Sequence, residues 1–147
     1  MKSKLKFRII MCLCIFLGSC ATTTQYAKFA GKEKLQSATT AKIYVLRPSM
    51  FGSAVKMKVF CNDKLMGKTG PKSYLSWEVP EWEHIIKSNS ENKDYFTVNA
   101  KAGKTYYIHQ NPKIGFVLVR SSLELLSENE GESVLAKLKE PKLKYAE

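Results

Sequence analysis

The chain has 147 residues, of which 44% are hydrophobic and 25% charged, and its 24 Lys and Arg against 13 Asp and Glu give a formal net charge of +11. This length suits one domain with its own core rather than a multidomain protein. Nucleic-acid binding is not expected, because Arg47 and Arg120 are the only arginines after residue 20 and base or phosphate recognition favours Arg over Lys.

Residues 1–19 have the pattern of a bacterial export signal. Lys2, Lys4, Lys6 and Arg8 carry positive charge without an acid, and residues 9–17 are all apolar. Such a run is too short to cross a bilayer, which takes about 20 apolar residues. Removal of the signal would take four positive charges with it, so the mature net charge would be 11 − 4 = +7.

Leu17-Gly18-Ser19-Cys20 ends this segment and resembles the lipobox of bacterial lipoproteins. The resemblance implies transfer of diacylglycerol to the Cys20 sulfur, cleavage between Ser19 and Cys20, and acylation of the new amino terminus. Ala21 stands where an Asp marks inner-membrane retention in such lipoproteins, so the resemblance favours an outer-membrane protein facing the periplasm. The alternative is a simple secretory signal with an incidental cysteine.

Residues 20–41 are rich in Thr, Ala, Lys and Gln without a sustained period, which predicts a flexible tether. About 20 flexible residues have an r.m.s. reach of roughly 25 Å, enough to lift a small domain clear of the lipid headgroups. Because Cys12 and Cys14 leave with the signal and Cys20 is lipidated, Cys61 stands alone and no internal disulfide is expected.

From Lys42 onward the pattern has period two and predicts a mainly β domain over residues 42–140. Cys61 is in phase with Val55, Met57 and Val59, so we expect it to be buried, and Trp77 is the strongest core candidate. Turn signals recur at roughly 8–12-residue spacing, which is typical of a sandwich or barrel. We expect an antiparallel β-sandwich of about eight short strands, namely 42–48, 55–61, 64–69, 74–79, 83–88, 95–100, 105–109, and 114–120 with 123–126.

One helix is predicted after the last strand. Ser127 and Glu130 have the spacing of a capping box. Val134, Leu135 and Leu138 then share one face until Pro141 ends the helix. Residues 141–147 are expected to form a basic tail.

Four short motifs resemble, in their order, a bacterial domain-of-unknown-function family of small lipoproteins with a core like the PEGA repeat, a small β-sandwich unit. They are residues 41–48 (AKIYVLRP), 59–67 (VFCNDKLMG), 79–84 (VPEWEH) and 102–107 (AGKTYY). The resemblance implies an envelope-associated binding module and brings no catalytic residues with it. Trp82 stands where the family corner has glycine, which predicts a positive φ and a strained backbone at this residue.

The chain is rich in aromatic residues, some of which fall on alternate faces of the predicted strands. Core packing accounts for those that face inward, whereas outward members form a stacking platform for envelope glycans or a protein. Trp82 and Tyr107 are the candidate partner-binding residues.

Catalytic and metal sites have weak support in the sequence. Ser121 or Ser122 with His109 is the one conceivable nucleophile–base pair, and no nucleophile elbow frames it. Neither His109 nor His84 has a metal-binding cluster beside it, and Gly67-Lys68-Thr69 lacks the upstream glycine of a phosphate loop because position 62 is Asn62.

These observations predict a non-enzymatic, membrane-anchored binding or scaffolding protein of the cell envelope. Its expected contacts are the membrane, through the lipid on Cys20, and an envelope protein or a polyanionic envelope polymer. No cofactor is implied. The alternative is a small envelope hydrolase using the Ser/His pair.

Overall fold

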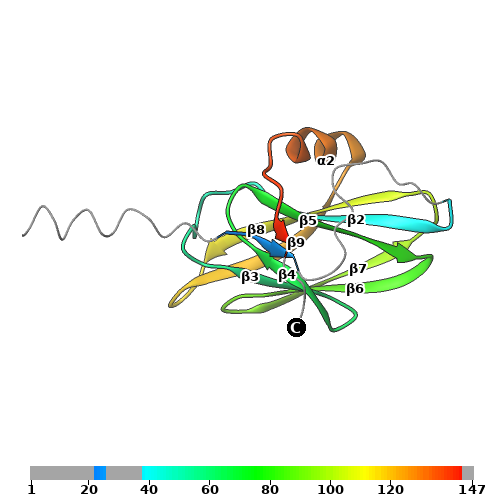
Figure 1. Cartoon of the computed structure of the whole chain (residues 1–147). Coiled ribbons are helices and arrows are strands. Elements are labelled where there is room, and N and C mark those ends of the chain that lie inside the picture. Colours follow the sequence, from blue (N-terminus) through cyan, green and yellow to red (C-terminus); the bar gives the residue numbers. More distant parts are fainter. Residues whose placement is uncertain (1–21, 26–37, 144–147) are drawn as a thin grey trace, which may run out of the picture.

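The computed structural model describes residues 22–25 and 38–143, which fold into two packed β-sheets and one helix (Figure 1). One sheet has six strands in the order β10-β1-β4-β3-β6-β7, and the other has four in the order β5-β2-β8-β9. The elements are β1 (Thr24–Gln25), β2 (Thr40–Arg47), β3 (Met57–Cys61), β4 (Lys64–Thr69), β5 (Ser73–Pro80), β6 (Trp82–Asn89), β7 (Lys93–Ala100), β8 (Thr105–Ile114), β9 (Val119–Leu126), α2 (Glu128–Leu135) and β10 (Lys142–Leu143).

The predicted fold class, a mainly β sandwich with a C-terminal helix, is confirmed. Most neighbouring strands are antiparallel, but β2 pairs in parallel with β8 and β1 pairs in parallel with β10. The β2–β8 pair brings the ends of these two strands, near Arg47 and Ile114, to the same end of the molecule.

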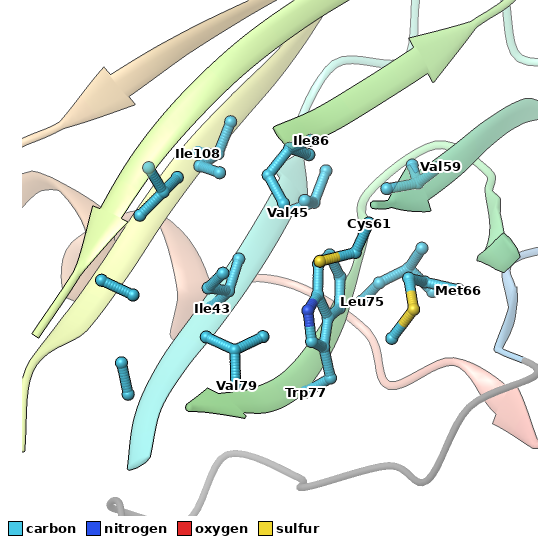
Figure 2. Close-up of a cluster of buried hydrophobic side chains, with 13 residues drawn as sticks. Ile43, Val45, Val59, Cys61, Met66, Leu75, Trp77, Val79, Ile86 and Ile108 are labelled. Carbon is cyan, nitrogen blue, oxygen red and sulfur yellow. The ribbon is translucent and has the colours of Figure 1, made fainter. Parts of the chain in front are cut away.

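The main core fills the space between the two sheets (Figure 2). Alternation along β3 turns Val59 and Cys61 inward while Lys58 remains exposed. Cys61 is buried as predicted, and burial raises the pKa of its thiol. Its sulfur lies beside the indole of Trp77 (Figure 2), which is also buried as predicted.

A second cluster lies on the outer face of the four-stranded sheet, where α2 covers it (Figure 1). The rings of Tyr44 and Tyr107 stack with 5.2 Å between their centroids, and Leu135 of the helix is buried against this cluster. The predicted capping box is confirmed, since Ser127 accepts from the amide of Glu130 while the Glu130 carboxylate accepts from the Ser127 amide.

The strand predicted over residues 114–120 is wrong. β8 continues to Ile114, β9 starts at Val119, and residues 115–118 form the connection of a β-hairpin. A continuous apolar run over these residues is typical of a buried strand, so the run concealed the turn at Gly115.

The predicted tether and basic tail both contain residues that are part of the fold. Thr24–Gln25 form β1, which pairs with β4 and with Lys142–Leu143 of β10. Two-residue strands carry no periodicity, and their pairing joins segments far apart in the chain, so the sequence pattern gave no sign of them.

Candidate functional site

Trp82 lies at the connection between the two sheets. β5 of the four-stranded sheet ends at Pro80 and β6 of the six-stranded sheet begins at Trp82, whose side chain is 68% exposed. The predicted positive φ at Trp82 is wrong, because the non-glycine residues of the described chain that have positive φ are Asn62, Asp63 and Lys72. Trp82 instead pairs with Ala100 as ordinary strand, so its indole is exposed without backbone strain.

Buried His84 fixes this connection from inside. Its Nδ1 accepts a hydrogen bond from Asn62 Nδ2 at 2.9 Å, so its Nε2 carries the proton and donates to the carbonyl of Pro80 at 2.9 Å. The Asn62 side-chain oxygen accepts from the amide of Ile85 at 2.9 Å, which sets the orientation of the amide group. His84 therefore has a structural role, and we call residues Pro80–Trp82 the Trp82 corner.

A neighbouring turn fastens the other side of the Trp82 corner. The amide of Ala102 donates to Glu81 Oε2 at 3.2 Å. The hydroxyl of Tyr106 donates to the carbonyl of Asn99 at 3.0 Å and accepts from the amide of Lys101 at 3.1 Å. Trp82 thus projects from a backbone that is held on both sides.

Tyr107, the second predicted partner-binding residue, is not at the surface. It is buried against Tyr44, and α2 packs over it so closely that a Cβ added at Gly131 would lie 2.1 Å from Tyr107 Cγ. Burial raises the pKa of its hydroxyl, and the carboxylates of Glu132 and Glu128 add to this effect. The prediction was wrong because the outward face of β8 is covered by the helix.

The most exposed of the large apolar side chains in the described residues belong to the hairpin between β8 and β9. Phe116 is 96% exposed and Ile114 is 83% exposed, and Val117 and Leu118 are also exposed. The sequence pattern concealed this feature, because its apolar run predicts a strand over the segment. Gly115 within the apolar run was the signal that could have revealed it.

The carboxylate of Glu91, from the β6–β7 connection, holds the tip of this hairpin. It accepts hydrogen bonds from the amides of Leu118 at 2.7 Å, Phe116 at 2.8 Å and Val117 at 3.2 Å. The bonds from Leu118 and Phe116 hold the pKa of Glu91 below its usual range, and Arg120 adds to this effect. The exposed tip therefore has a defined backbone conformation.

A second loop, between β2 and β3, is held at the same end by the buried side chain of Arg47. Its Nη1 donates to the carbonyls of Val55 at 2.7 Å and Thr69 at 3.0 Å, and its Nη2 donates to those of Gly52 at 2.8 Å and Phe51 at 3.3 Å. Charge-assisted bonds of this kind are about twice as strong as neutral ones. Arg47 thus fixes the loop to the sheet.

This loop and the hairpin meet, because a Cβ added at Gly52 would lie 2.7 Å from Cγ2 of Val119. In Figure 1 the turquoise loop after β2 and the hairpin of β8 and β9 lie at the left end of the sandwich. We call the exposed apolar residues gathered there the apolar end: Met50, Phe51, Ile114, Phe116, Val117 and Leu118.

The Ser/His alternative is only partly compatible with the geometry. Ser121 is buried and its Oγ lies 2.6 Å from Ser88 Oγ, so it faces the opposite sheet, whereas His109 lies on the outer face with Nδ1 2.8 Å from a Glu124 oxygen. Ser122 shares the face of His109, but no side-chain hydrogen bond joins the two in the described part of the chain. Among residues 22–25 and 38–143 there is also no group of His, Cys, Asp and Glu suited to a metal ion.

The predicted lipidation and cleavage residues, Ser19 and Cys20, lie outside the described residues. None of the helices in the described ranges is long and apolar enough to cross a membrane.

The comparison with known families gives a match across most of the sandwich. The model of the family described as "Protein of unknown function (DUF2846)" matches residues 37–121, from before β2 into β9. The chain belongs to this family. The expected membership of a family of unknown function is therefore confirmed.

A similar protein extends the similarity along the chain. An uncharacterized protein of Haemophilus influenzae is 28% identical over 135 residues, which cover 88% of this chain and 80% of the relative. No solved structure matches the chain.

Proposed function

We propose that this DUF2846 protein is a lipid-anchored protein of the bacterial cell envelope that acts as a non-enzymatic binding or scaffolding module. The observation that carries the proposal is the Leu17-Gly18-Ser19-Cys20 box directly after a basic and apolar leader. Two or three acyl chains, each contributing about 0.8 kcal/mol per buried methylene, make such an anchor effectively permanent. The proposed location is the outer membrane, facing the periplasm.

The Trp82 corner is the proposed binding site for an envelope protein. Tryptophan is among the residues that contribute most to protein interfaces, because its large ring fills a partner pocket and excludes water. The bonds made by His84 and Glu81 hold the backbone beneath Trp82 in place, so little additional ordering is needed on binding. An exposed tryptophan on a fixed backbone supports a binding role more directly than a catalytic one.

Photo-crosslinking in living cells tests this site. A photoreactive amino acid replaces Trp82 in the full lipidated chain, and a matched variant carries it at exposed Glu128 on α2. We expect position 82 to give a discrete crosslinked protein that position 128 does not give. Equal crosslinking at the two positions would remove the Trp82 corner as the binding site.

A further inference from the structure

We infer that the apolar end is a membrane-contacting surface, with the β8–β9 hairpin tip inserted into the boundary between headgroups and acyl chains of the bilayer that holds Cys20. The inference rests on the proposed lipid anchor and deepens it by assigning the orientation of the domain. It places the Trp82 corner on the side that faces away from the membrane.

The path of the chain into the fold is the first argument. β1 runs antiparallel to β4, with Thr24 opposite Lys68, so Thr23 lies beside the end of β4. There its hydroxyl oxygen accepts a hydrogen bond from the amide of Gly70. This is the end where the carbonyl of Thr69 accepts a hydrogen bond from Arg47. The chain therefore enters the sandwich at its apolar end.

The short distance to Cys20 is the second argument. Only Ala21 separates Cys20 from Thr22, the first described residue, and two residue steps span at most about 7 Å. A lipid on Cys20 therefore brings this end of the domain to the membrane. The expected reach of roughly 25 Å would apply only if β1 were free of the sheet.

Gln25 keeps β1 in the sandwich. Its side-chain Nε2 donates to the carbonyl of Ser76 at 2.7 Å, and its Oε1 accepts from the amide of Ser76 at 3.1 Å. Gln25 is fully buried. Because Ser76 belongs to β5 and Gln25 to β1, these bonds join the two sheets beside the anchor.

The chemistry of the hairpin tip suits an apolar boundary. Phe116, Val117 and Leu118 present apolar side chains to solvent, and their three amides already donate to Glu91. An unpaired amide is costly to remove from water. The tip therefore enters the membrane boundary without leaving these amides unpaired.

Charge around the apolar end favours an anionic lipid surface over an apolar protein pocket. The exposed basic side chains at this end outnumber the exposed carboxylates, and one of those carboxylates, that of Glu91, is occupied by the hairpin amides. Basic residues beside an inserted apolar group strengthen binding to anionic lipids. The basic residues are Lys56, Lys72, Lys113, Arg120 and Lys139, and the carboxylates are Glu91 and Glu140.

Depth-dependent fluorescence quenching in vesicles tests the orientation. The full lipidated protein is reconstituted into phosphatidylglycerol-containing vesicles with brominated acyl chains, which quench only nearby tryptophans. One variant carries Phe116→Trp with Trp82→Phe, and the matched control is the native chain with Trp82. Both retain Trp77, which is buried between the sheets.

We expect the tryptophan at position 116 to lose most of its emission and to shift to shorter wavelength, while Trp82 is unaffected. Equal quenching at the two positions, or none at 116, would overturn the inference. Photo-crosslinking from position 118 to a protein in cells, in place of lipid, would also overturn it. Co-flotation of both variants with the vesicles reports the anchor separately, so loss of flotation would contradict the proposed function and not the orientation alone.

Discussion

Single polar side chains hold the backbone beneath the exposed aromatic residues of the apolar end and of the Trp82 corner. Glu91 holds the hairpin tip through three backbone amides, and His84 holds the Trp82 corner through Pro80 and Asn62. Glu91 reaches amides 25 to 27 residues away in the sequence, whereas His84 joins the side chain of Asn62, 22 residues away, to the carbonyl of Pro80, four residues away. Exposed aromatic residues are thereby kept in defined positions.

Replacing Glu91 with Gln is expected to loosen the hairpin tip. The amide side chain is a weaker acceptor than a carboxylate, so the backbone amides of residues 116–118 should exchange with deuterium faster. Hydrogen exchange monitored by NMR measures this, with Glu83→Gln at the exposed start of β6 as the control. Unchanged exchange at 116–118 would show that the carboxylate does not order the tip.

The same carboxylate predicts a pH dependence of the native chain. Because the pKa of Glu91 is lowered in the folded state, its stabilising effect is present above the unfolded pKa of about 4.3. The effect is lost as the pH falls through the lowered native value. Exchange at the tip should therefore be slow at neutral pH and accelerate relative to the control segment only under acidic conditions.

Replacement of the two tryptophans is expected to change the free energy of unfolding by very different amounts. Trp77→Ala should lower the free energy of unfolding by about 3–5 kcal/mol because it opens a cavity in the core. Trp82→Ala should change it by no more than about 0.5 kcal/mol, as an exposed substitution does. Chemical denaturation measures both. A large loss of stability for Trp82→Ala would make this residue structural.

At the scale of elements, the strands β2 to β7, the start of β8 and the capped start of the helix followed from the sequence, because each has a regular apolar period or a cap. Cys61 and Trp77 were placed correctly by alternation alone. Tyr107 was not, since alternation gives the face of a strand but not whether a helix from elsewhere in the chain covers that face. The hairpin at residues 115–118 was missed because its side chains are apolar although they are exposed.

β1 is the element on which the proposed orientation depends, and the sequence pattern did not reveal it. Gln25→Ala removes both bonds to Ser76 and should lower the free energy of unfolding by about 1–3 kcal/mol, the cost of leaving a buried polar group unpaired. Denaturation of the chain carrying Cys20→Ser measures this, with exposed Thr22→Ala as the control. Equal stability of the two variants would mean that β1 does not join the sheets.

At the scale of the whole molecule, the sandwich carries the Trp82 corner and the apolar end at opposite ends. Strand β6 leads from the Trp82 corner to the connection that carries Glu91, a distance of about 23 Å for its eight residues. With the apolar end against the membrane, the Trp82 corner would point into the periplasm. A domain fixed in this way presents its binding site at a constant height and orientation.

The proposed function depends above all on the lipid at Cys20, and the mass of the protein extracted from membranes tests this most directly. We expect the wild-type mass to equal that of residues 20–147 plus the diacylglyceryl group on the sulfur and the acyl group on the amino terminus, and Cys20→Ser to accumulate as the unlipidated precursor, because a hydroxyl cannot form the thioether. An unmodified wild-type chain, or a Cys20→Ser chain that still carries lipid, would contradict lipidation at Cys20.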